Sequence, residues 1–209
     1  MTIKSNNLKN KFMKKILLTL SAVAVLGFAA NAQTEKAKFM VGGQVSYDGQ
    51  TVKDSDIKEN SFSIVPNVGY FVADNIAVGL GLGYQWNKAE VDDNSSNTVS
   101  AFQLAPFGRM YSNNAGPVKF FGQLSVPMSW GERKINDDKV ATTSNYGVEL
   151  APGLAFFPTS NIGIEFKVRG LYFQSSTEKA EATDIETTRN SYGLNANSLA
   201  PTVGVTFHF

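Results

Sequence analysis

Residues 76–86 have the sequence Ile-Ala-Val-Gly-Leu-Gly-Leu-Gly-Tyr-Gln-Trp. Large apolar or aromatic side chains occupy every even position, and small or polar residues, chiefly glycine, occupy every odd position. Side chains of a β-strand alternate between two faces, whereas a helix would scatter both sets around its surface. This stretch is therefore predicted to be a strand with one apolar face and one face lined by small residues.

The same period of two recurs along the chain after residue 38. Eight strands are predicted on this basis, at 39–47, 61–71, 76–86, 98–111, 118–130, 143–157, 162–173 and 191–209. Three connections between them are short and turn-like: 72–75, 112–117 and 158–161. Four are long and polar: 48–60, 87–97, 131–142 and 174–190. Short turns at one end and long loops at the other predict an all-β fold, an eight-stranded antiparallel up-and-down barrel.

Several prolines fall inside these predicted strands, and four of them precede a short turn or the C-terminus by several residues: Pro66, Pro106, Pro152 and Pro201. Proline has no N–H group to donate to a strand ladder, and within sheets it is confined to edges and bulges. We expect a β-bulge at each of the four sites.

The first 32 residues have the features of a secretory signal peptide. Lys14 and Lys15 precede an apolar run from Ile16 to Ala30, which ends in Ala30-Asn31-Ala32. The run is too short for a membrane-spanning helix, which needs about 20 apolar residues. We predict a cleaved signal peptide at residues 1–32 and a barrel domain at residues 33–209, with Met13 as an alternative start.

Composition excludes several classes of function. Residues 33–209 carry 14 basic and 18 acidic side chains, a balance unsuited to a general nucleic-acid binder. The chain has no cysteine and one histidine, His208, which excludes disulfides and thiol chemistry and leaves little for a metal site. No catalytic residue, cofactor or metal is predicted.

The distribution of charge distinguishes a membrane barrel from a soluble, lipocalin-like one. Of the 18 acidic residues, 14 lie in the four long connections. The predicted strands contain six charges, all on the face that carries glycine, alanine, serine and glutamine: Arg109, Lys119, Glu149, Glu165, Lys167 and Arg169. A charge on the lipid face near the membrane midplane costs about 2–4 kcal/mol. We therefore expect these six side chains to lie paired inside the barrel, with Glu149 near Arg169.

The opposite face is apolar along every predicted strand. It carries Phe39, Val41, Phe62, Ile64, Leu80, Leu82, Phe102, Leu104, Phe120, Leu124, Leu150, Phe166, Val203, Val205 and Phe207. Aromatic residues of this face gather at two levels, as the headgroup girdles of an outer-membrane barrel require. Those near the long loops are Tyr47, Tyr84, Trp86, Trp130, Tyr146 and Tyr172; those near the short turns are Phe39, Tyr70, Phe120, Phe156 and Phe209.

The last strand alternates through Val203, Val205, Phe207 and Phe209, and the chain ends on this aromatic residue. With this ending the chain resembles the small OmpA/OmpX-type barrels, in particular the outer membrane protein beta-barrel domain family. The resemblance implies an outer-membrane location in a Gram-negative-type bacterium, contact with outer-membrane lipid, and recognition of Val205, Phe207 and Phe209 by the barrel-assembly machinery. It implies little about activity, because members share a scaffold and differ in function.

Candidate catalytic features have simpler structural explanations. The stretch 79–83, Gly-Leu-Gly-Leu-Gly, lacks the following helix that a phosphate loop requires. Glu149 and Glu165 are carboxylates of the type used in acid–base catalysis, but the neighbouring arginines and lysines explain them as counter-charges. His208 lies near the short-turn end, where we expect a solvated or hydrogen-bonded ring.

An eight-stranded barrel has an interior only wide enough for its own side chains. The expected function is therefore a non-enzymatic outer-membrane protein, whose four long external loops make structural, adhesive or protective contacts with an unidentified external ligand. The alternatives are a barrel enzyme acting on outer-leaflet lipid and a narrow, porin-like ion channel.

Overall fold

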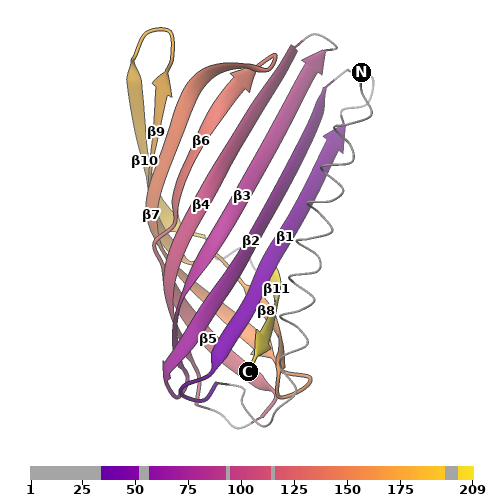
Figure 1. Cartoon of the computed structure of the whole chain (residues 1–209), viewed down its shortest axis with the longest axis vertical. Helices are drawn as coiled ribbons and strands as arrows, with labels where there is room; N and C mark the ends of the chain where they lie inside the picture. Colours follow the sequence, from indigo (N-terminus) through magenta and orange to yellow (C-terminus); the bar gives the residue numbers. More distant parts are fainter. Residues whose placement is uncertain (1–33, 52–56, 93–94, 114–115, 196–201) are drawn as a thin grey trace, which may run out of the picture.

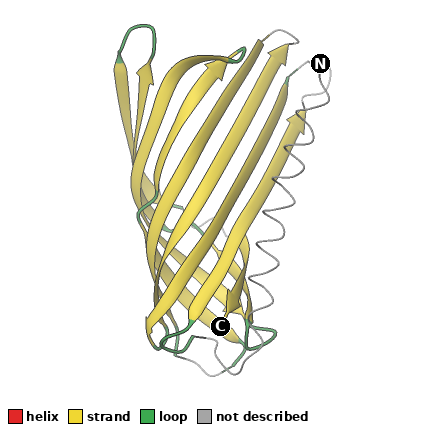
Figure 2. Ribbon diagram, in the orientation of Figure 1, coloured by secondary structure: helices red, strands yellow, loops and turns green. Residues whose placement is uncertain are grey.

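The computed structural model describes residues 34–51, 57–92, 95–113, 116–195 and 202–209. The predicted signal peptide lies outside these ranges. The described part of the chain is built from antiparallel strands joined by turns (Figures 1 and 2). Within it, no helix has the length and apolar character needed to cross a membrane.

Eleven strands are formed along the described chain. They are β1 (Phe39–Thr51), β2 (Lys58–Ala73), β3 (Ile76–Asp92), β4 (Ser95–Tyr111), β5 (Val118–Ser125), β6 (Met128–Ile135), β7 (Asp138–Phe156), β8 (Ile162–Lys167), β9 (Leu171–Ala180), β10 (Glu186–Leu194) and β11 (Thr202–His208). All pair antiparallel in one sheet, and β11 pairs with both β1 and β8. Because β8 also pairs with β7, the sheet closes on itself as a barrel.

The eleven strands correspond to the eight predicted ones. β5 and β6 follow one another between β4 and β7, and β8 and β9 follow one another along β7. β10 and β11 likewise lie along β9 and β8. The predicted eight-stranded antiparallel up-and-down barrel is confirmed, with three of its strands each interrupted once.

One interruption follows directly from Pro152. Gly153 pairs with Lys167 and Leu150 pairs with Leu171, so two residues of β7 face three residues between β8 and β9. The extra residue is a β-bulge, and the Val168 N–H donates to the Pro152 carbonyl at 3.1 Å within it. The predicted bulge at this proline is confirmed.

The bulges predicted at Pro66 and Pro106 are wrong. The ladder beside each proline has a gap of two residues, but the register is identical on the two sides of the gap. Because side chains alternate every second residue, a gap of two omits hydrogen bonds without changing which face a residue occupies. Pro201 lies outside the described residues.

The bulge opposite Pro152 also corrects the placement of Tyr172. Leu171 and Phe173 are exposed on the outer wall, whereas Tyr172 pairs with Glu149 on the lumen face. Its ring lies 3.9 Å below the Arg169 guanidinium carbon. Tyr172 therefore does not belong to the outer aromatic girdle, because the extra residue reverses the alternation after Arg169.

The four predicted long loops are mostly paired strand rather than loop. The β1–β2 ladder continues to Thr51 and Lys58, and the β6–β7 ladder continues to Ile135 and Asp138. Asn136 and Asp137 close the latter hairpin with φ of 52° and 70°, as in a type I′ turn. These extended segments carry polar residues on both faces, as expected where a sheet continues into water beyond a membrane.

Strand length agrees with this extension. At about 3.4 Å per residue and a tilt of about 40°, a strand as long as β3 spans roughly 44 Å along the barrel axis. β3 has 17 residues. The outer apolar band of such barrels is about 25 Å tall. The strands therefore extend well beyond the length of such a band at the end where the hairpins β1–β2, β3–β4, β6–β7 and β9–β10 lie. These four, here called the external hairpins, are at the top of Figure 1.

Glycines on the lumen face allow large side chains from neighbouring strands to fill the barrel. A Cβ on Gly79 would lie well inside van der Waals contact with the Phe107 ring and the Val68 carbonyl. Gly79→Ala is therefore expected to lower the free energy of unfolding by about 1–3 kcal/mol, through overpacking. Urea unfolding in lipid vesicles measures this loss.

Gly108→Ala is the matched control. Gly108 lies on the neighbouring strand β4, and a Cβ there would meet no atom within 4 Å. An equal loss of stability in both variants would contradict this account of the lumen packing.

Candidate functional site: the filled lumen and its external cup

The lumen near the short-turn end contains a buried ionic cluster centred on Arg109. Its guanidinium pairs with Glu165 at 2.5 Å and donates to the Tyr111 hydroxyl at 2.8 Å. It also donates twice to the Gln123 amide oxygen, at 3.0 and 2.6 Å. Glu165 accepts a further hydrogen bond from Thr206 at 3.1 Å. Most donors of Arg109 therefore have protein partners, and this charge is fixed in place.

A second ion pair lies between β7 and the bulged strand. The Arg169 Nε donates to a Glu149 carboxylate oxygen at 3.1 Å, and a terminal nitrogen donates to Gln174 at 3.1 Å. Only one nitrogen of Arg169 contacts Glu149. The guanidinium therefore keeps donor capacity for another acceptor.

The two lysines of the predicted charge set are placed differently. Lys119 lies at the short-turn end, where its ammonium donates to Thr34 at 2.9 Å and to the Asn75 side chain at 3.0 Å. Within the described residues, the Lys167 side chain has neither an ion pair nor a hydrogen bond. The structure thus places four of the six predicted charges in two ion pairs and leaves both lysines without a carboxylate partner in its described part.

An aromatic layer below the Arg109 cluster was not predicted. It is a buried cluster of apolar residues at the short-turn end: Met40, Phe71, Ala77, Tyr111, Phe121, Ala155 and Phe157. His208 is fully buried in this layer, with its ring 5.7 Å from Phe71 and 5.2 Å from Phe157. It lies within hydrogen-bond distance of Thr206, at 3.3 Å. Of the two expected environments for His208, the hydrogen-bonded one is found.

A sequence signal for this layer exists. Phe71, Tyr111, Phe121 and Phe157 each lie within a few residues of a short turn, on the parity of the lumen charges. Large rings at such positions have nowhere to pack except across the barrel interior. Together with the Arg109 cluster they form a layer of buried side chains at this end of the lumen, here called the seal.

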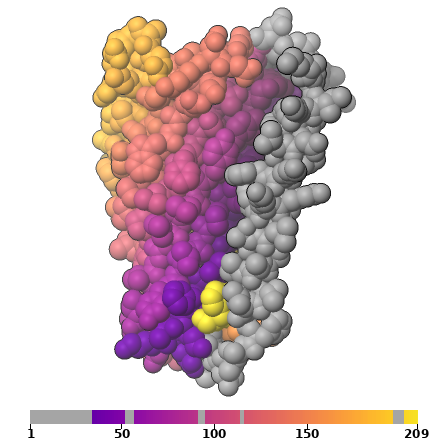
Figure 3. Space-filling view, in the orientation of Figure 1, coloured from indigo at the N-terminus to yellow at the C-terminus, as the bar shows by residue number. Residues whose placement is uncertain are grey.

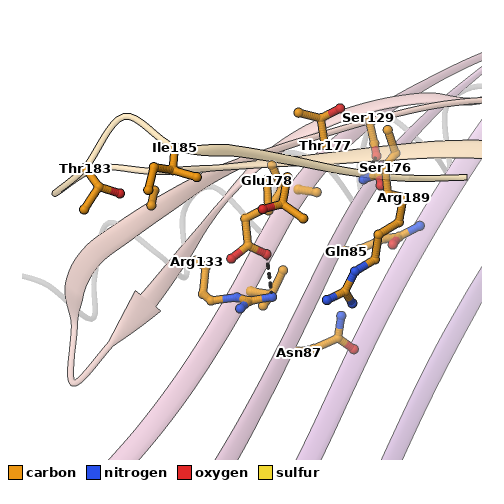
Figure 4. Close-up of a pocket in the computed structure, with 16 residues that line it drawn as sticks. Gln85, Asn87, Ser129, Arg133, Ser176, Thr177, Glu178, Thr183, Ile185 and Arg189 are labelled. Carbon is orange, nitrogen blue, oxygen red and sulfur yellow. Dashed lines mark hydrogen bonds and ion pairs between the residues drawn. The ribbon is translucent and has the colours of Figure 1, made fainter.

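Above this seal the lumen contains two cavities, so the expectation of an interior filled by its own side chains is wrong for this part of the barrel. The upper cavity, of about 550 Å³, lies among the external hairpins and is lined by residues including Asn87, Arg133, Glu178 and Arg189. Arg133 pairs with Glu178 at 2.8 Å, and Arg189 extends from β10 toward Gln85 and Asn87 of β3 (Figure 4). The lower cavity, of about 690 Å³, lies on the Arg109 cluster and shares Gln85 with the upper one.

The external hairpins carry further ion pairs, which are half-exposed. Lys88 pairs with Glu90 at 2.5 Å, and Lys134 pairs with Glu132 at 2.7 Å. In each pair the hydrogen bond from the ammonium lowers the pKa of the carboxyl group. Exposed pairs of this kind contribute little to stability. Among the described residues, no group of three histidine or acidic side chains could hold a metal ion.

The outer wall carries many exposed apolar side chains over the middle of the barrel. Figure 3 shows one face of this wall. Exposed side chains on it include Val78, Leu80, Leu82, Phe102, Phe120, Leu124, Val148, Leu150, Phe166, Leu171, Phe173, Val203 and Val205. Toward the external hairpins, the Trp130 indole N–H donates to the Tyr146 hydroxyl at 3.0 Å. At the short-turn end Phe39 contacts the rings of Tyr70 and Phe209. An apolar belt bounded by aromatic rings is the surface of a barrel that lies in lipid.

A closed barrel with an apolar wall and ionic lumen defines the class of outer-membrane β-barrel proteins. The family described as Outer membrane protein beta-barrel domain matches residues 18–209. The chain belongs to this family. Its place is the outer membrane of a Gram-negative-type bacterium.

Solved structures with similar folds are outer-membrane proteins. OprG from Pseudomonas aeruginosa matches with a TM-score of 0.50 and 11% identity, over 86% of this chain and 99% of that chain. A major outer membrane protein from Thermus thermophilus matches with a TM-score of 0.46 and 13% identity, over 84% of this chain and 100% of that chain. Neisserial surface protein A matches with a TM-score of 0.44 and 10% identity, over 82% of this chain and 96% of that chain. No curated protein sequence matches the chain.

Removing Arg109 tests the buried cluster. Arg109→Met leaves the buried Glu165 carboxylate without its counter-charge, and we expect a loss of about 3–5 kcal/mol in the free energy of unfolding. The double variant Arg109→Met/Glu165→Gln is expected to recover part of this loss. The measurement is urea unfolding in lipid vesicles.

Arg133→Met is the matched control, because it breaks the half-exposed pair with Glu178. Its loss should stay below about 1 kcal/mol. The account of the buried cluster fails if the two single variants have equal stability.

Proposed function

We propose that the protein is a non-catalytic surface protein of the outer membrane, whose external hairpins make adhesive or protective contacts outside the cell. The observation that carries the proposal is the projection of four paired, charged hairpins beyond the apolar belt. The hairpins carry both positive and negative side chains near their turns, including the ion pairs of Lys139 with Glu181 and of Lys179 with Asp184. Such surfaces favour contact with polar partners rather than with lipid.

Features of the lumen favour this proposal over the two alternatives, a narrow ion channel and an enzyme acting on outer-leaflet lipid. The aromatic layer and the Arg109 cluster occupy the cross-section that an ion pathway would need. A lipid hydrolase of the histidine-dependent kind would need its base near the outer leaflet, whereas His208, the one histidine of the chain, lies at the opposite end. Neither feature supports a channel or an enzyme.

Shortening a hairpin tests the proposal. The variant removes Ser176–Arg189 and joins Ser175 to Asn190 through an Asn-Gly turn, because Ser175 and Asn190 are paired partners. The barrel is expected to fold, shown by faster gel migration before boiling than after it. Adhesion of cells that carry the variant to protein-coated and polysaccharide-coated surfaces is expected to fall.

The equivalent shortening of β3–β4 removes Lys88–Thr98 and joins Asn87 to Val99, which are also partners. It identifies which hairpin makes the contact. Unchanged adhesion after all four hairpins are shortened would refute the proposal.

We also propose that Val205, Phe207 and Phe209 form the signal for the barrel-assembly machinery. Two features support it. Phe207 pairs with Val41 at the barrel seam, and Phe209 exchanges backbone hydrogen bonds with Phe39, at 2.7 and 3.0 Å. The proposed signal therefore lies on the strand that closes the barrel.

Phe209→Ala separates recognition from stability when compared with Phe39→Ala. Each variant removes one ring of the stacked Phe39–Phe209 pair, whose centroids are 6.4 Å apart. We expect Phe209→Ala to reduce the amount of folded protein in the outer membrane severalfold, while Phe39→Ala leaves it near the wild-type level. Equal amounts of the two variants in isolated outer membranes would contradict the assignment.

A further inference from the structure

The lower cavity has an uneven distribution of charge. Its charged lining consists of three cations and one carboxylate: Arg109, Lys167, Arg169 and Glu149. Glu165, the partner of Arg109, does not line the cavity. The space above the seal is therefore bordered by an excess of positive charge in the middle of a membrane protein.

The three cations differ in how much of their bonding capacity the protein uses. Arg109 is held by Glu165, Tyr111 and Gln123. Arg169 contacts Glu149 through one nitrogen only and keeps donors for another acceptor. The Lys167 ammonium interacts electrostatically, at longer range, with Glu149, Arg109 and Glu165. Neither carboxylate lies within ion-pair distance of its ammonium.

We propose that the lower cavity binds a small organic anion, a carboxylate or a phosphate ester, between the Lys167 ammonium and the Arg169 guanidinium. Lys167 ends β8 and Arg169 lies two residues further, at the bulge opposite Pro152. The Lys167 side chain is half-buried in the lumen. Even partial burial of a cation without a counter-charge is costly, and an anionic group of a ligand would supply that charge. Hydrogen bonds between oppositely charged groups are among the strongest that proteins form.

The remaining lining fits the polar part of such a ligand. Amide and hydroxyl side chains make up much of it, among them Gln44, Asn67, Ser46 and Ser63. A volume of about 690 Å³ falls within the range of pockets for small molecules. An apolar ligand would leave a group such as the buried Asn67 side-chain oxygen, which has no hydrogen-bond partner in the described part of the protein, unsatisfied. A hydrophilic anion is therefore the better fit.

The cavity is approached from the external side. It shares Gln85 with the upper cavity, and the upper cavity lies among the external hairpins. On its other side lie the Arg109 cluster and the aromatic layer. The ligand would therefore be taken from outside the cell and held above the seal, without passage through it.

The experiment titrates the folded full-length barrel in detergent micelles with succinate and, separately, with inorganic phosphate at constant ionic strength. Amide signals are followed by NMR. Succinamide, the neutral analogue of succinate, is the control ligand. We expect saturable shifts at Lys167, Arg169 and their neighbours with either anion and none with succinamide.

Three variants test the assigned residue. Lys167→Met is expected to weaken binding of succinate at least about tenfold, through loss of one charge-assisted hydrogen bond. Lys167→Arg should retain binding and shows that the site tolerates substitution. Lys119→Met is the matched control, because it removes a lysine of equal charge from the same barrel interior on the other side of the aromatic layer.

Shifts that do not saturate, or that appear equally with succinamide, would overturn the proposal. So would equal weakening by Lys167→Met and Lys119→Met, which would indicate general attraction to a basic interior. Binding of phosphate without succinate would restrict the ligand class to phosphate esters, and the reverse would restrict it to carboxylates. The hairpin-shortening experiment is independent of these outcomes, because it leaves Lys167 and Arg169 unchanged.

Discussion

The whole structure depends on the separation of ionic and apolar side chains by residue parity. Hydrocarbon cannot solvate charges or unpaired backbone groups, so a strand can cross it only within a closed sheet and with its charges on the inner face. Arg109 and Leu124, on the adjacent strands β4 and β5, illustrate the result. Arg109 is buried in the lumen, and Leu124 is exposed on the outer wall. Closure of β1 onto β11 completes the sheet that this constraint requires.

The same constraint divides the interior into two unlike parts. At the short-turn end, Phe71, Tyr111, Phe121 and Phe157 fill the cross-section, and the Arg109–Glu165 pair lies on them. Toward the external hairpins the lumen is lined mainly by polar side chains, and cavities remain. A barrel of eight strands can thus be closed at one end and hollow at the other, because its large aromatic rings gather at one end.

Periodicity in the sequence was sufficient to predict eight strands and their two faces, because lipid imposes a strict alternation. It could not predict the position of Tyr172, since the bulge opposite Pro152 depends on the pairing of two strands and reverses the alternation locally. The extent of the hairpins was also missed. Beyond the membrane both faces are wet, so polar residues are as compatible with a strand as with a loop. The charged lumen residues were recognisable from parity, whereas their partners depend on the register between strands and on the reach of each side chain.

The most direct test of the central claim is a scan of single cysteine substitutions along residues 78–83 and 102–105, possible because the chain has no native cysteine. Each cysteine carries a nitroxide spin label in the membrane-embedded barrel. Collision rates with oxygen, which concentrates in lipid, are then compared with those of a water-soluble nickel complex. The account predicts an oxygen signal of period two, with maxima at Val78, Leu80, Leu82, Phe102 and Leu104. Equal oxygen accessibility at neighbouring positions, or maxima at Gly81 and Gln103, would contradict it.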